Sequence, residues 1–218
     1  MTSLETTPRS GADTFARYAM IASAVFSPLA IAVSILLAPG NVTAEGEAYV
    51  RQFVDGAGSY PLLAWLSAIS AFTIIPGALG VARVARAGRP VLGLVAMILA
   101  FVLIVPISGN SDDVLYAGIK AGLDPATLTK LYTAYNESLP TSILGMAFLL
   151  GLVGFLLLGV ATLLGKSAPT WAAIALIVAP VVIPISWFAG LGNVFAGVAW
   201  LVMAVGMGGV ALGLLNRR

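Results

Sequence analysis

Six apolar runs dominate the sequence, and each can cross the hydrocarbon core of a bilayer, which takes about 20 helical residues. Backbone polar groups must be paired within lipid, so such runs form helices or closed barrels. None of the runs shows the period-two alternation of barrel strands. We therefore predict an all-α membrane protein, a bundle of six transmembrane helices. The predicted spans are residues 18–37, 61–84, 91–107, 142–164, 171–188 and 194–215.

The composition indicates the same class of protein. Of the 218 residues, 60% are hydrophobic and only 9% are charged, whereas a soluble domain carries about a quarter charged residues. The chain contains no histidine and no cysteine, which excludes disulfides, thiol nucleophiles and the usual zinc ligands. We expect no metal and no cofactor. The small net charge of +2, without a basic block, predicts no nucleic-acid partner.

The charges between the spans divide into two groups. On one side, which includes the segment RVARAGR at 83–89, eight Lys or Arg residues face two acidic residues, a balance of +6. On the other side, three Lys or Arg residues face seven acidic residues, a balance of −4. Short loops rich in Lys and Arg stay in the cytoplasm. We therefore predict that both termini are cytoplasmic and that the acidic loops lie outside.

The length of the chain allows one membrane domain. We expect the first span to be retained, because its apolar run is longer than the core of a signal peptide. The predicted organisation is a cytoplasmic N-terminal tail (1–17), a six-helix transmembrane domain (18–215) with outer loops 38–60 and 108–141, and a cytoplasmic C-terminal end (216–218).

Both outer loops carry amphipathic helical patterns, in AEGEAYVRQFVD (44–55) and PATLTKLYTAYNES (125–138). Asp124 followed by Pro125 is the preferred order of an N-cap and a first helical residue. We predict two short amphipathic helices on the extracytoplasmic side, on the membrane surface or covering the bundle, with aromatics at headgroup level. The predicted inward faces are Tyr49, Val50, Phe53 and Val54, and Leu128, Leu131, Tyr132 and Tyr135.

Two adjacent carboxylates follow the third span in VLIVPISGNSDD (102–113). Ser111 is a good N-cap and the helix dipole favours acidic groups in a first turn, so Asp112 and Asp113 are suited to begin a short helix. Alternatively, Asp112, Asp113 and Glu137 are candidate catalytic residues. A carboxylic acid near an apolar cavity can have a raised pKa and act as a general acid on a lipid-soluble, isoprenoid-like substrate.

The motif Pro-Ile-Ser at 106–108 recurs at 184–186, and Gly-Val-Ala at 80–82 recurs at 159–161. The two pairs of spans run in the same sense, so the recurrence indicates either a parallel repeat or chance within an Ala/Val/Leu/Gly alphabet. Because proline removes a backbone hydrogen bond, we predict that both Pro-Ile-Ser segments kink or end their helices. They are ordinary helix stops or they flank an outward-facing cavity.

Glycine is abundant, with 24 residues, and is concentrated in the fourth and sixth spans. Small residues let transmembrane helices approach closely. These glycines therefore indicate close packing within the bundle or, alternatively, a homo-oligomer interface. The residues concerned are Gly151, Gly154, Gly159, Gly206, Gly208, Gly209 and Gly213.

The spans carry no ionisable residue near their centres, which argues against an ion-coupled transporter. We expect a protein that binds membrane lipids or a hydrophobic small molecule at its extracytoplasmic face. The alternatives are a membrane-embedded enzyme (a carboxylate-dependent cyclase or isomerase), a structural subunit of a membrane complex, or a passive transporter. The candidate ligand-binding residues are Tyr116, Tyr132, Tyr135, Trp187 and Asn193.

The Ala/Gly/Val/Leu alphabet, the inner segment RVARAGRPVLG (83–93) and the long acidic outer loop resemble the small multi-pass integral membrane proteins of unknown function in actinobacteria. The resemblance covers most of the chain and implies a six-helix plasma-membrane protein, with no catalytic residues to transfer. The size and outer carboxylates are also similar to those of small integral-membrane terpene cyclases. Their acidic motifs do not align with this sequence, so that likeness is an analogy.

Overall fold

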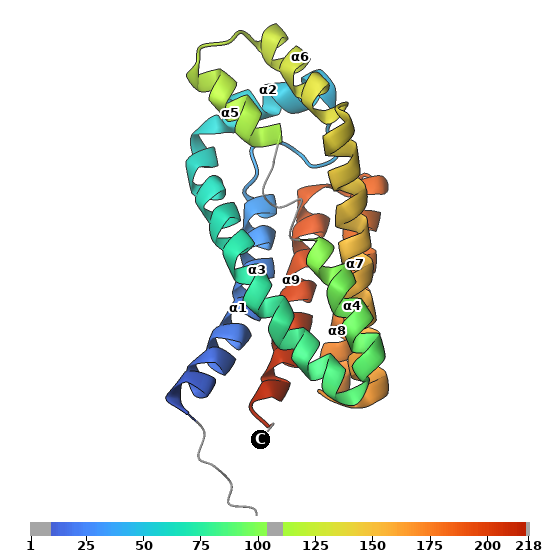
Figure 1. Cartoon of the computed structure of the whole chain (residues 1–218). Coiled ribbons are helices and arrows are strands. Elements are labelled where there is room, and N and C mark those ends of the chain that lie inside the picture. The colour runs from blue at the N-terminus through green and yellow to red at the C-terminus, as the bar shows by residue number, and fades with distance from the viewer. Residues whose placement is uncertain (1–9, 104–110, 217–218) are drawn as a thin grey trace, which may run out of the picture.

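The computed structural model describes residues 10–103 and 111–216, and all regular structure in these ranges is helical (Figure 1). This confirms the all-α prediction for the part of the chain described. The long helices are α1 (Gly11–Leu36), α3 (Tyr60–Gly88), α7 (Leu139–Gly165), α8 (Thr170–Phe188) and α9 (Gly192–Ala211). The shorter helices are α2 (Gly46–Gly56), α4 (Pro90–Val102), α5 (Ser111–Lys120) and α6 (Pro125–Asn136), with 3-10 turns η1 (Ala57–Ser59) and η3 (Leu212–Leu214).

Five helices among the described residues are long and apolar enough to cross a membrane, and they match the first, second, fourth, fifth and sixth predicted spans. The predicted third span begins in α4, which has 13 residues and is therefore about 20 Å long. That length is shorter than a hydrocarbon core of about 30 Å, and residues 104–107 of the predicted span lie outside the described residues. The sixth crossing stays a prediction.

The long helices form one bundle, in which α1 packs between α3 and α9, α4 packs on α7, and α8 packs on α7 and α9. Helix α1 begins and α9 ends at the same end of the bundle (Figure 1). The turns from α3 to α4, at Arg89, and from α7 to α8, at Lys166, lie at that end too. The fold thus gathers the loops of the positive group at one end, as the charge pattern requires.

Close contacts within the chain account for the seven predicted glycines of α7, α9 and η3. A Cβ on Gly154 would lie 2.1 Å from the Ala100 nitrogen in α4, and one on Gly206 would lie 2.6 Å from the Leu176 nitrogen in α8. The other five predicted glycines also meet atoms of the same chain within 3.2 Å of an added Cβ. Close packing inside the bundle therefore uses these glycines, and association between copies stays a prediction.

Helix α8 continues through Pro180 and Pro184 and ends at Phe188, one turn after the second proline. Ser186 Oγ donates to the carbonyl of Ile183 at 2.6 Å, so this hydroxyl is paired within its own helix. Pro-Ile-Ser 184–186 therefore lies inside the last turns of α8, and the helix ends two residues after it. The matching Pro-Ile-Ser at 106–108 lies outside the described residues, and the repeat is untested.

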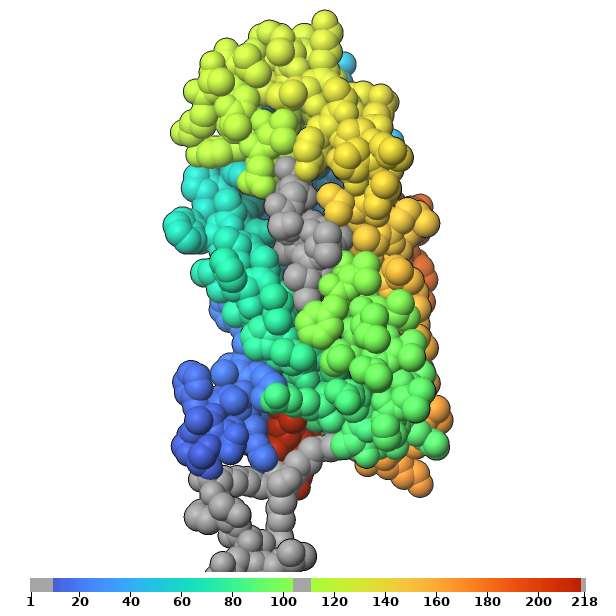
Figure 2. Space-filling model, in the orientation of Figure 1, coloured from blue at the N-terminus to red at the C-terminus, as the bar shows by residue number. Residues whose placement is uncertain are grey.

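Three short helices, α2, α5 and α6, gather at the other end of the bundle and are called the cap below (Figure 1). Helices α2 and α6 occupy the two predicted amphipathic segments, and α5 is a third. The surface of α5 and α6 covers this end of the molecule (Figure 2). The described part of α5 runs from Ser111 to Lys120, and because residue 110 lies outside the described residues, the N-cap role of Ser111 stays a prediction.

The cap has its own apolar cluster, separate from the core of the bundle. Tyr49, Val50 and Phe53 are buried on α2, as the amphipathic pattern predicts, and Leu128 is buried on α6. Leu131 departs from the predicted face, because it is 38% exposed. The inward faces of α2 and α6 therefore pack on each other and on α5, so that the aromatic rings meet inside the cap.

Candidate functional site

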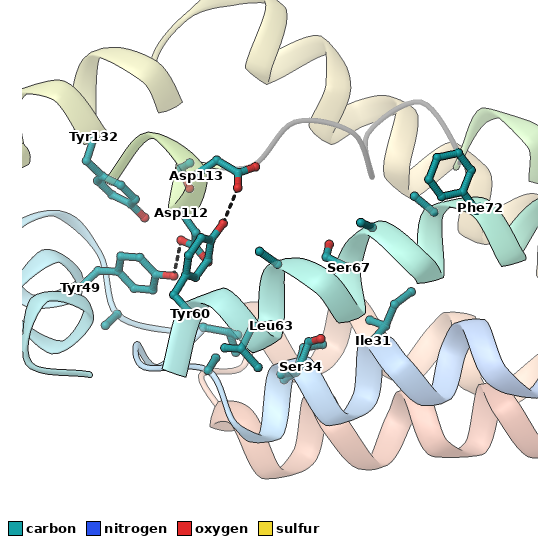
Figure 3. Close-up of a pocket in the computed structure, with 18 residues that line it drawn as sticks. Ile31, Ser34, Tyr49, Tyr60, Leu63, Ser67, Phe72, Asp112, Asp113 and Tyr132 are labelled. Carbon is teal, nitrogen blue, oxygen red and sulfur yellow. Dashed lines mark hydrogen bonds between the residues drawn. The ribbon is translucent and has the colours of Figure 1, made fainter. Parts of the chain in front are cut away.

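A cavity of about 620 Å³ lies between α1, α3 and the cap (Figure 3). Its volume falls within the range of about 300–1,000 Å³ that is typical of small-molecule sites. The cap end of the cavity is polar, whereas the end between α1 and α3 is mostly apolar. The polar end contains Tyr49, Tyr60, Asp112, Asp113 and Tyr132, and the apolar end contains Ile31, Ile35, Leu63, Ala64, Ala68, Ala71 and Phe72.

Two carboxylate–phenol hydrogen bonds organise the polar end. Tyr49 Oη on α2 donates to Asp112 Oδ1 at 2.6 Å, and Tyr60 Oη on α3 donates to Asp113 Oδ1 at 2.6 Å. Such short O–H···O distances are typical of hydrogen bonds to an ionised acceptor. Because the two aspartates are neighbours in the first turn of α5, the pair of bonds ties α5 to two other helices.

The tyrosines also form a continuous array of rings. Tyr49 stacks on Tyr132 of α6, with ring centres 5.2 Å apart and planes 23° from parallel. The ring centre of Tyr60 lies 5.0 Å from that of Tyr116 on α5 and 5.3 Å from that of Phe53, which it meets edge-on. Aromatic pairs at these separations are stabilising. The array fixes where each phenol group points, and three of its members line the cavity.

Burial and the negative charge of Asp112 raise the pKa values of two cap tyrosines. Burial is the larger cause for both Tyr49 and Tyr132, and the Asp112 carboxylate adds to it. A raised phenol pKa keeps the hydroxyl protonated at neutral pH. Tyr49 donates its hydroxyl proton to Asp112 on α5, and both phenols are neutral beside this carboxylate.

The open volume arises from a stripe of small residues on α3. Ala64, Ser67, Ala68 and Ala71 all line the cavity, and their i, i+3, i+4, i+7 spacing places them on one helical face. Side chains of this size leave a gap where larger ones would fill the space between α3 and α1. The stripe is visible in the sequence as small residues at helical spacing, although the hydropathy of the span gives no sign of it.

Serine hydroxyls mark where the cavity ends and the packed bundle begins. Beyond it, Ser27 and Ser70 are buried, and each Oγ lies 3.1 Å from the carbonyl oxygen of the other residue. Ser34, which lines the cavity (Figure 3), has a buried Oγ that makes no hydrogen bond within the described structure. Buried hydroxyls are usually paired, so Ser34 leaves one polar group for an occupant of the cavity.

The structure brings together three of the predicted site residues, Asp112, Asp113 and Tyr132, on the cavity wall. Tyr49 and Tyr60 join them, although neither is among the site residues predicted from the sequence. Tyr116 is one ring removed from the wall, in contact with Tyr60. The aspartates thus do more than occupy a first helical turn, because each accepts a hydrogen bond from a phenol hydroxyl of another helix.

The remaining candidates lie elsewhere. Tyr135 is not among the described lining residues, and Glu137 is exposed at the end of α6. Trp187 packs on Phe148, with ring centres 5.3 Å apart. Asn193 accepts a hydrogen bond from the Val42 nitrogen at 2.7 Å and holds the first outer turn against α9. No described lining residue comes from α8, so the cavity is not the one envisaged beside Pro-Ile-Ser 184–186.

The site's chemistry is that of carboxylates, phenols and hydroxyls. Within residues 10–103 and 111–216, no three His, Cys, Asp or Glu side chains come close enough to hold a metal ion. What the arrangement offers is two hydrogen-bonded carboxylates at one end of a largely apolar cavity. Such a site can bind an amphipathic molecule or transfer a proton to or from one.

These features define an all-helical chain with several helices apolar enough to cross a membrane and a polar-ended cavity beneath a helical cap. No known protein family model matches the sequence, and neither a curated protein nor a solved structure is significantly similar to it.

Proposed function

We propose that this is a multi-pass protein of the bacterial plasma membrane that binds an amphipathic lipid or hydrophobic small molecule in the cavity beneath the cap. In this proposal both termini are cytoplasmic, the cap is extracytoplasmic, and α4 with the residues after it provides the sixth crossing. The observation that carries the binding function is the two-ended cavity, with Asp112 and Asp113 at one end and apolar side chains at the other.

An opening towards the lipid fits this function. Phe72 lines the apolar end of the cavity, yet its side chain is 79% exposed. Trp65 and Ile69, on the same helix, are exposed as well. Exposed apolar side chains on a membrane helix face the acyl chains. A ligand dissolved in the bilayer would therefore enter beside Phe72 and place its polar group under the cap.

Filling the cavity tests this proposal. Ala68 lines the cavity and is exposed within it, so Ala68→Phe adds bulk without displacing packed atoms. Ala22→Phe is the matched control, because Ala22 is an exposed alanine on α1 that is not among the lining residues. Lipids that co-purify with each protein in a mild detergent would be identified and quantified by mass spectrometry.

We expect the amount of a specific lipid that co-purifies with Ala68→Phe to be at least tenfold lower than with the wild type. With Ala22→Phe the amount should equal that of the wild type. The expected loss follows from steric exclusion, because the phenyl ring occupies the space of the apolar tail. Equal amounts of the same lipids in all three proteins, each folded by circular dichroism, would contradict binding in this cavity.

A membrane-embedded enzyme is the second candidate, because the two carboxylates share the cavity wall with protonated phenols. A carboxylic acid or phenol placed against an apolar substrate can donate a proton to an alkene or epoxide. Chromatography of the recovered lipid before and after incubation separates the two functions. A binding protein returns the ligand unchanged, whereas a cyclase or isomerase returns a compound of altered retention time.

A further inference from the structure

The polar end of the cavity narrows the class of ligand. Its described lining residues include two carboxylates and three phenols, and none of them is Lys or Arg. A site of this charge is complementary to a cation and unfavourable for an anion. We propose that the ligand of the cavity is an amphipathic amine, whose ammonium group lies beside Asp113 and Asp112 and against the tyrosine rings. This inference rests on the proposed binding function.

Asp113 supplies the most direct contact. Its Oδ1 atom accepts the Tyr60 hydroxyl at 2.6 Å, and its Oδ2 atom accepts no hydrogen bond from the described residues. The Tyr60 bond fixes the carboxylate plane and leaves the second oxygen to accept an N–H from the ligand. Hydrogen bonds between an ammonium and a carboxylate are about twice as strong as those between neutral groups.

The ring array adds a second recognition element. A cation is attracted to the face of an aromatic ring when it lies within about 6 Å of the ring centre. Tyr49, Tyr60 and Tyr132 line the cavity on the same side as Asp112 and Asp113 (Figure 3). The same array already holds one ammonium group, because Lys120 Nζ lies 5.3 Å from the centre of the Tyr116 ring. Carboxylates and ring faces together are suited to an ammonium group.

The charge of the surroundings distinguishes an amine from a phospholipid with an ammonium headgroup. A phospholipid would also place its phosphate near the two carboxylates, with no Lys or Arg among the described lining residues to neutralise it. The predicted outer side as a whole carries seven acidic residues against three basic ones. A single-chain amine without a phosphate therefore fits better than phosphatidylethanolamine.

The test compares amphiphiles that share one chain and differ in the head: dodecylamine, dodecanol, dodecyl phosphate and a lysophosphatidylethanolamine of the same length. Binding to the purified protein in a neutral maltoside detergent would be measured by equilibrium dialysis at pH 7, with empty micelles subtracted. We expect dodecylamine to bind at least tenfold more tightly than dodecanol, and dodecyl phosphate and the lysophospholipid more weakly than dodecylamine.

Two variants locate the effect. Asp113→Asn keeps an oxygen that accepts the Tyr60 hydroxyl but removes the charge, so we expect it to weaken dodecylamine binding about tenfold and leave dodecanol binding unchanged. Asp55→Asn is the matched control, because Asp55 is an exposed carboxylate on the water-facing side of α2 that is not among the lining residues. We expect this control to bind all four amphiphiles as the wild type does.

The outcomes separate this inference from the proposed function. Equal binding of dodecylamine and dodecanol, both blocked by Ala68→Phe, would refute amine recognition while leaving a lipid-binding cavity. Tighter binding of the lysophospholipid than of dodecylamine would identify a phospholipid as the ligand instead. Binding of every amphiphile unaffected by Ala68→Phe would refute the cavity as a binding site altogether. If Asp55→Asn and Asp113→Asn weakened dodecylamine binding equally, the binding would depend on the general surface charge and the proposed site beside Asp113 would be refuted.

Discussion

The contact between α4 and α7 gives a stability prediction whose size follows from the coordinates. In Gly154→Ala the new Cβ would lie 2.1 Å from the Ala100 nitrogen and 2.5 Å from the Leu99 carbonyl carbon, whereas ordinary Cβ contacts are 3.4–4 Å. Both partners are backbone atoms, so the two helices must separate by roughly 1 Å, a gap that forfeits about a quarter to a half of each dispersion contact. Overpacking of this kind typically costs about 1–3 kcal/mol.

Gly145→Ala on the same helix is the matched control, because an added Cβ there meets nothing within 4 Å. Both substitutions gain about 1 kcal/mol of helix propensity, so this contribution cancels in the comparison. We expect Gly154→Ala to be less stable than Gly145→Ala by about 1–3 kcal/mol. Reversible unfolding in mixed micelles, followed by tryptophan fluorescence, measures the difference. Equal stabilities within about 0.5 kcal/mol would refute the direct backbone contact.

Two further predictions concern the cap and its side of the membrane. Asp124 Oδ1 accepts the backbone N–H groups of Ala126 and Thr127 at 3.0 Å each, so Asp124→Ala should speed proteolysis at the start of α6. Hydrogen bonds from Thr127 lower the pKa of Asp124 below its usual 3.8. The wild-type helix start is therefore protected from proteolysis at pH values above 3.8, and it loses this protection in stronger acid. Equal cleavage of the wild type and Asp124→Ala at about pH 7 would contradict the N-cap. Alkaline phosphatase fused after residue 120 should be active and after residue 87 inactive, and the opposite pattern would reverse the proposed topology.

Hydropathy was sufficient to predict most of the bundle, because a helix in lipid is determined by its own residues. The predicted span 171–188 differs from α8 by one residue, and 142–164 lies within α7. Helix α1 begins at Gly11, seven residues before the predicted start of the first span. Its start is set by Ser10, whose Oγ accepts the Asp13 backbone N–H at 3.1 Å, and a capping residue leaves no trace in hydropathy.

The site was less predictable, because its hydrogen bonds join residues far apart in the chain. The amphipathic pattern correctly placed Tyr49 on the inward face of α2, but its partner Asp112 lies 63 residues away. Only the position of α5 above α2 and α3 brings the two together, and no local pattern encodes that position. The small-residue stripe from Ala64 to Ala71 is local, and its spacing could have indicated an open face on α3.

The position of α1 between α3 and α9 has a consequence for synthesis in the membrane. Gly208 of α9 receives Val25 of α1, so about 180 residues must be added after Val25 before this contact can form. At about 5–20 residues per second, a ribosome needs roughly ten to forty seconds for that stretch. The α1–α3 hairpin, joined by Ser27 and Ser70, therefore has to persist in the bilayer with one face of α1 uncovered until α9 has been synthesised.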